Sequence, residues 1–195
     1  SALDVPVTLV EPRGTILDFV DRELVDDFIH QLRDRGVIVR LGSAVSEISV
    51  RPTGAEVALA DGRTVRSDIV LYAAGRAGAV DALKLDTVSI EADARGRIQV
   101  DPRTFQTSVP HIYASGDVIG FPSLASTSME QGRVAACHAF GMPLPPPPET
   151  FPYGIYAVPE ISTVGQSEEE VRRSGTAYEC GVARFRETSR GHIMG

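Results

Sequence analysis

The sequence predicts an α/β fold, because strand and helix patterns alternate in it. Residues 7–39 have the pattern of a strand, a helix and a second strand. Residues 44–72 contain short apolar runs separated by turn signals, and residues 111–140 pair an apolar run with a helical pattern. Together these patterns indicate a parallel βαβ unit with an antiparallel meander attached to it.

The βαβ unit follows from helical periodicity and from the signals at the helix ends. In the expected helix, apolar residues recur four positions apart at Leu24, Phe28 and Leu32. Val25 and Ile29 lie beside them on the same face. Asp21 is a good N-cap residue, and Gly36 suits the position just after the last turn. We therefore expect strands at residues 7–10 and 37–39, joined by a helix and paired in parallel.

The meander is predicted from turn residues between three short strands. The expected strands are residues 44–50, 56–59 and 65–72. Thr53-Gly54 makes the first turn, and Asp61-Gly62 is a hairpin signal because a type I′ turn requires positive φ angles. The last strand is expected to end at Ala73-Ala-Gly-Arg76.

The remaining elements are less regular. We expect strands at residues 97–100, 111–114, 154–158, 177–185 and within 192–195, and helices at residues 124–140 and 167–173. Ser167 and Glu170 have the spacing of a capping box for the last helix. Residues 143–150 are rich in proline and predict a stiff linker.

Composition excludes several classes of protein. The chain has 195 residues, with 19 Lys and Arg against 26 Asp and Glu, so its net charge is −7. That balance argues against nucleic-acid binding, and no apolar run is long enough to predict a membrane span. Cys137 and Cys180 form no CxxC pair, so we expect no metal site, no disulfide scaffold and a cytoplasmic location. Both chain ends are expected to be cuts through a longer protein.

Glu11 and Arg13 form the first candidate site. A carboxylate at the carboxyl end of a parallel strand lies where a dinucleotide places its adenosine ribose. Arg13 could pair with the 2′-phosphate that distinguishes NADP from NAD, so the pair is not firmly set for either nucleotide. A solvated strand-end glutamate and a surface arginine are the alternatives, and no GxGxxG motif is present in the chain.

A second candidate site combines Gly116 and Asp117 with the helix that follows. Glycine lets a phosphate or ribityl chain approach the backbone, and Asp117 can accept hydrogen bonds from polyol hydroxyls. The helix that begins near Leu124 and Ala125 directs its positive end toward a ligand beyond it. Ordinary turn chemistry is the alternative.

The segment Ala74-Gly75-Arg76 is the third candidate. Small residues at the end of a strand allow a ligand to approach the backbone closely. A tight exit from the sheet explains the same residues equally well. The chain contains no GxxxxGK[ST], HExxH or GxSxG motif, and the sequence assigns no catalytic residue.

Four stretches carry a resemblance to a known family: residues 71–76, 113–126, 130–133 and 154–165. Through them the whole chain resembles the flavin-dependent pyridine nucleotide–disulfide oxidoreductases. The resemblance implies a partial Rossmann-like NAD(P) domain at residues 1–78 and a returning FAD-domain segment at 79–142. The linker at 143–150 would then lead into the start of an α+β dimerisation (interface) domain at 151–195.

The resemblance also implies roles for the candidate residues. Glu11 would bind the NAD ribose, and Gly75 with its neighbours would line the nicotinamide nucleotide. Asp117 would hold the FAD ribityl chain, while Leu124 and Ala125 would present N–H groups to the flavin.

The implied activity is hydride transfer between NADPH and NAD through FAD, in a homo-oligomeric parent protein. The 195 residues alone are expected to bind FAD weakly and to show no turnover. A disulfide reductase like dihydrolipoamide dehydrogenase and a non-catalytic dinucleotide-binding module are the alternatives.

Overall fold

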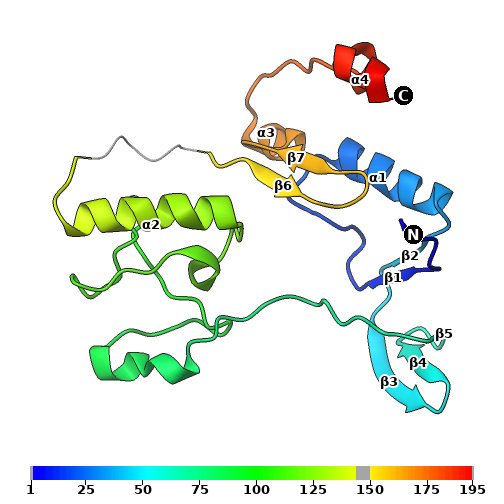
Figure 1. Ribbon diagram of the computed structural model, residues 1–195, viewed down its shortest axis with the longest axis horizontal. Helices are drawn as coiled ribbons and strands as arrows, with labels where there is room; N and C mark the ends of the chain where they lie inside the picture. The colour runs from blue at the N-terminus through cyan, green and yellow to red at the C-terminus, as the bar shows by residue number, and fades with distance from the viewer. Residues whose placement is uncertain (1, 144–149, 195) are drawn as a thin grey trace.

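The computed structural model describes residues 2–143 and 150–194. Most of the expected proline-rich linker, residues 144–149, lies outside the described residues. Figure 1 shows an open arrangement, with α2 on one side and the β1–α1–β2 unit on the other. An extended stretch that follows β5 leads back from the meander to the α2 side.

The predicted βαβ unit is confirmed. It consists of β1 (Thr8–Glu11), α1 (Arg22–Asp34) and β2 (Ile38–Leu41). The strands pair in parallel, from Thr8 opposite Ile38 to Glu11 opposite Leu41. The helix ends as predicted, with Gly36 at a φ of +77°.

The buried stripe of α1 agrees with the prediction except at its first position. Val25, Phe28 and Ile29 are buried, whereas Leu24 is 46% exposed. Val25 and Ile29 join Val20 in a core cluster. The predicted stripe is therefore confirmed at Val25, Phe28 and Ile29, and Leu24 lies outside its buried part.

The meander forms, but its last strand is shorter than expected. Its strands are β3 (Val45–Arg51), β4 (Gly54–Leu59) and β5 (Thr64–Ser67), paired antiparallel in that order. The apolar residues after Ser67 are not part of a strand, and Ile69, Leu71 and Tyr72 are 84%, 87% and 81% exposed. A strand requires a hydrogen-bonded neighbour, and within the described residues nothing pairs with this run.

The middle of the chain is dominated by α2 (Ala125–Ala139), as predicted. Three short 3₁₀ turns precede it: η1 (Asp81–Leu83), η2 (Leu85–Val88) and η3 (Gly116–Ile119). The strands expected at residues 97–100 and 111–114 are wrong, since each contributes only an isolated bridge. Val134 and Ala135 of α2 pack against Phe105 to form the core of this part.

The last part contains a hairpin and a capped helix. Its elements are β6 (Tyr153–Ile155), β7 (Ile161–Thr163), α3 (Glu168–Ser174), η4 (Phe185–Glu187) and α4 (Ser189–Met194). The capping box of α3 is confirmed. Residues 177–185 form no strand, and the strand expected near 192–195 is wrong because residues 189–194 are helical.

Side chains from the βαβ unit, the α2 region and the β6–β7 hairpin lie close together. Ile155 and Ile161 of the hairpin pack against the core cluster beneath α1, and Figure 1 shows the hairpin beside that helix. Three aromatic rings meet nearby, with centroid separations of 5.5 Å for Phe19–Phe121, 4.8 Å for Phe19–Tyr153 and 5.2 Å for Phe121–Tyr153. No helix in the described ranges is long and apolar enough to cross a membrane.

Candidate dinucleotide-binding site

Glu11 and Arg13 bind each other at the carboxyl end of β1. The Arg13 backbone N–H and Nε both donate to Glu11 Oε1, at 3.0 and 2.8 Å, and Nη2 donates to Oε2 at 3.3 Å. The predicted pair is therefore brought together by the structure. These hydrogen bonds lower the pKa of Glu11 and raise the pKa of Arg13, the shared side-chain hydrogen bond being the largest cause in each case.

The backbone around this pair is held by the end of β2. Ser43 N donates to the Glu11 carbonyl at 3.1 Å, and Gly42 N donates to the Arg13 carbonyl at 2.8 Å. Ser43 is buried. The strand tip thus has a fixed backbone, while the Arg13 side chain is 56% exposed.

Asp18 completes this group, and the sequence analysis did not single it out. Its Oδ2 accepts a hydrogen bond of 3.1 Å from Arg13 Nη1. Arg13 therefore lies between two carboxylates, those of Glu11 and Asp18. The spacing of five residues from Arg13 to Asp18 carried no helical or strand pattern, because the segment between them is an irregular turn.

The second group forms around Gly116 and Asp117. Gly116 is buried at a φ of +81°, and its N–H donates to Gln131 Oε1 at 2.7 Å. A Cβ added at Gly116 would lie 3.2 Å from Ser128 Oγ, so the turn packs closely on α2. Gln131 was not predicted, although it lies within the stretch 130–133 that carried the family resemblance.

The third candidate segment joins this second group. Arg76 Nε lies 3.7 Å from Asp117 Oδ2, with the Asp117 side chain about half exposed (49%). Ala74 and Gly75 are exposed, and Gly75 has a φ of +111° with no atom within 4 Å of an added Cβ. The segment 74–76 is therefore open to solvent beside Asp117.

The start of α2 completes the second group. Leu124 is the N-cap residue, no side chain caps the helix, and its first turn has no acidic residue. The first N–H groups of a helix have no partner within it, so Ala125 and its neighbours offer donors at the positive end of the helix. This end can bind an anion or a polarised carbonyl group.

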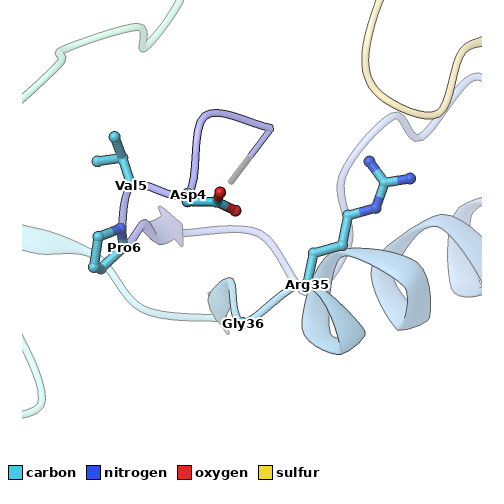
Figure 2. A pocket seen from close by; sticks show the side chains of 5 residues that line it. All are labelled: Asp4, Val5, Pro6, Arg35 and Gly36. Carbon is cyan, nitrogen blue, oxygen red and sulfur yellow. The ribbon is translucent and has the colours of Figure 1, made fainter.

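The two groups lie apart. Figure 1 places β1, which carries Glu11, on the opposite side of the molecule from α2. A separate hollow of about 230 Å³ lies beside the first strand. Figure 2 shows that the Arg35 side chain extends away from Asp4 there. The lining residues of the hollow include no predicted site residue: Asp4, Val5, Pro6, Arg35 and Gly36.

Several relatives of known name are similar to this chain over nearly its whole length. Relatives from Mycobacterium bovis and Mycobacterium tuberculosis named soluble pyridine nucleotide transhydrogenase are 50% identical over all 195 residues. A relative of the same name from Marinomonas sp. is 40% identical over 193 residues. The chain spans about 42% of the length of the mycobacterial relatives and 41% of the Marinomonas one.

Solved structures show the same likeness. LpdA from Mycobacterium tuberculosis has a TM-score of 0.89 at 27% identity, covering 98% of this chain and 42% of that one. The HOCl-induced flavoprotein disulfide reductase of Escherichia coli has a TM-score of 0.85 at 27% identity, covering 97% and 43%. The mixed α/β chain is therefore structurally similar to part of a flavoprotein disulfide reductase.

The family model described as pyridine nucleotide-disulphide oxidoreductase matches residues 1–132. That match covers more than half of the 195 residues. The resemblance predicted from residues 71–76 and 113–126 is thus confirmed, and the chain belongs to the pyridine nucleotide-disulphide oxidoreductase family.

Proposed function

We propose that this chain is part of a flavin-dependent oxidoreductase that transfers hydride between NADPH and NAD through FAD. The observation that carries the proposal is the 50% identity, over the whole chain, to relatives named soluble pyridine nucleotide transhydrogenase. The chain spans 42% of their length, so the activity belongs to the longer protein.

The proposed division of the chain follows the resemblance. Residues 1–78 belong to a partial Rossmann-like NAD(P) domain, and residues 79–142 are the returning segment of an FAD domain. Residues 143–150 link these to the start of a dimerisation domain at 151–195. Nicotinamide nucleotides are the small-molecule partners, and a cytoplasmic homo-oligomer stays a prediction.

The first group of residues suits the ribose of a nicotinamide nucleotide. A carboxylate has about four acceptor positions, and Glu11 uses three of them on Arg13. At least one position on Oε2 is therefore open to a ribose hydroxyl. Arg13 supplies the positive charge that a 2′-phosphate requires.

The second group suits FAD. The half-exposed Asp117 carboxylate can accept hydrogen bonds from ribityl hydroxyls, and Arg76 occupies only one of its oxygens. The buried Gln131 holds the Gly116 backbone in place beneath it. The uncapped N–H groups at the start of α2 would stabilise negative charge at the carbonyl edge of a bound ring.

Each residue then has a separate task. When bound, FAD would supply the redox centre that takes hydride from one nicotinamide and returns it to another. Glu11 and Arg13 would orient the nucleotide, and Asp117 would fix the position of the ribityl chain. Gly75 and its neighbours would let the nucleotide approach the backbone.

A disulfide reductase is the second candidate function. Its support is the structural likeness to the HOCl-induced flavoprotein disulfide reductase. The greater sequence identity to transhydrogenases, 50% against 27%, favours the first candidate.

A chimeric protein tests the proposal. The corresponding 42% of the mycobacterial relative is replaced by these 195 residues, so that the relative supplies the rest of the fold. We expect the purified chimera to bind FAD and to reduce thionicotinamide-NAD with NADPH. A flavin-loaded chimera without this activity would contradict the proposal, and reduction of a disulfide substrate instead would favour the second candidate.

The chain by itself is the matched comparison. We expect the purified 195-residue protein to show little flavin absorbance and no turnover. Tight stoichiometric FAD in this sample would contradict that expectation without affecting the proposed activity of the longer protein.

A further inference from the structure

Asp18 has no role in the proposed function, yet it contacts Arg13, the cation that pairs with Glu11 at the β1 tip. Its Oδ2 accepts from Arg13 Nη1 at 3.1 Å, while Glu11 takes Nε and Nη2 of the same guanidinium. Arg13 is thus shared between a carboxylate that suits a ribose and a second carboxylate beside it. The contact is exposed, so its geometry depends on how firmly the Asp18 backbone is held.

The backbone on both sides of Asp18 is held. Leu17 has a φ of +51°, and its carbonyl accepts from Val20 N at 2.9 Å, which closes a tight turn around Asp18. Leu17 and Phe19 pack against the core cluster that contains Val20. The turn therefore presents the Asp18 carboxylate to Arg13 from a fixed position.

Arg13 has spare hydrogen-bonding capacity despite its two partners. A guanidinium carries five N–H donors, and three of them are used on Glu11 and Asp18. The two that remain, one on Nη1 and one on Nη2, are available to phosphate oxygens. A 2′-phosphate could therefore bind Arg13 while Glu11 keeps its hydrogen bonds.

Charge opposes this contact. The two carboxylates and one guanidinium give the group a net charge of −1. A phosphate monoester carries about −1.5 to −2 at pH 7, whereas a ribose diol is neutral. Asp18 therefore weakens the attraction of Arg13 for a 2′-phosphate and leaves binding of the ribose diol at Glu11 almost unchanged.

We propose that Asp18 determines the balance between NADP-type and NAD-type nucleotides, because its negative charge weakens the attraction of Arg13 for the 2′-phosphate. The inference rests on the proposed function, in which the longer protein must use both nucleotides. By lowering the preference for the 2′-phosphate, Asp18 lets one ribose site accept either form. Asp18 acts through Arg13 and is therefore a positioning residue.

Nucleotide titrations of the whole 195-residue chain test this inference. The probes are 2′,5′-ADP, which carries the 2′-phosphate, and ADP, which has the free diol, with binding followed by nitrogen-15 NMR. The variant is Asp18→Asn. The control is Asp26→Asn, which removes one charge from an exposed carboxylate of α1 that pairs with Arg22.

We expect Asp18→Asn to tighten binding of 2′,5′-ADP by about three- to five-fold and to change ADP binding by less than about two-fold. Asp26→Asn should leave the ratio of the two affinities unchanged. In an Arg13→Gln background, Asp18→Asn should change this ratio only slightly, through the direct repulsion between Asp18 and the phosphate. A merely structural role of Asp18 would not depend on Arg13 in this way.

The outcomes separate the two proposals. Binding of ADP without a changed ratio in Asp18→Asn overturns the role of Asp18 alone, and so does an equal change in Asp26→Asn. Failure of the unsubstituted chain to bind either probe, even at millimolar concentration, overturns the nucleotide site at Glu11 and the inference with it.

Discussion

The Asp21 carboxylate accepts a hydrogen bond of 2.6 Å from the backbone N–H of Glu168, a residue 147 positions further along the chain. Asp21 is the N-cap residue of α1 but makes no side-chain cap to its own helix. Glu168 is the first residue of α3, whose capping box is already supplied by Ser167 and Glu170. One carboxylate thus lies at the positive ends of two helices from different parts of the chain.

Replacing Asp21 by alanine should destabilise the protein, because it exposes an unpaired N–H at the start of α3. The loss of an N-cap acceptor costs about 1 kcal/mol. Urea unfolding, followed by circular dichroism, measures the change. Asp26→Ala on the exposed face of α1 is the control, and an equal loss there would show that Asp21 has no special role.

Acid should remove the stabilisation that the Glu11–Arg13 pair supplies. The side-chain hydrogen bond from Arg13 holds the pKa of Glu11 below its ordinary value of 4.5. The stabilisation is therefore fully present above pH 4.5 and is lost as the pH falls through the lowered pKa. We expect Glu11→Gln to flatten this acid limb of stability against pH, and Arg13→Gln should flatten it similarly. If the loss of stability at acid pH persists in both variants, other carboxylates are responsible for it.

Glu11→Ala should weaken ADP binding more than 2′,5′-ADP binding. The substitution removes an acceptor for the ribose hydroxyls and also a negative charge that repels a 2′-phosphate. Parallel titrations of the two nucleotides measure the difference. Equal losses for both would show that Glu11 does not discriminate between them.

A methyl group at Gly116 should be more harmful than one at Gly141. Both glycines have positive φ angles, +81° and +63°, so alanine is strained at either position. An added Cβ meets Ser128 Oγ at 3.2 Å at Gly116 and nothing within 4 Å at Gly141. We expect a loss of about 1 kcal/mol for Gly141→Ala and a larger loss for Gly116→Ala in thermal unfolding. Similar losses would show that Ser128 gives way without cost.

In the chimeric protein, Asp117→Ala should reduce FAD retention by about 1.5–3 kcal/mol, as expected for hydrogen bonds to a charged group. Flavin absorbance after gel filtration at graded dilution measures the affinity. Asp86→Ala, an exposed carboxylate in η2, is the control. Unchanged FAD retention in Asp117→Ala would remove Asp117 from the proposed site.

The helices α1, α2 and α3 were predictable from the sequence because their hydrogen bonds are local, whereas the short helix α4 was expected to be a strand. The ends of α1 followed from Asp21 and Gly36, and the start of α3 followed from its capping box. Strands were less predictable because their partners are distant. The apolar runs at residues 69–72 and 97–100 have strand-like composition, but the described part of the chain gives them no strand neighbour beyond isolated bridges. The short strand β7 was not predicted, because it forms through its hydrogen bonds to β6 and its own residues carry no clear strand pattern.

The candidate residues could be predicted individually from the sequence, but most of the contacts between them could not. Proximity in sequence indicated that Glu11 and Arg13 could act together, and the structure joins them. The pairing of Arg76 with Asp117, 41 positions away, had no sequence signal. Nor did the Asp18 contact, because an exposed aspartate in an irregular turn resembles any other surface carboxylate.

The rings of Phe19, Phe121 and Tyr153 have a mechanical consequence. Each ring comes from a different part of the chain, so the βαβ unit cannot swing away from the α2 region without separating stacked or tilted faces. A movement that brings Glu11 closer to Asp117 by displacing these parts would have to keep or break the contacts among the three rings. These ring contacts would disfavour large sliding displacements between the βαβ unit, the α2 region and the β6–β7 hairpin.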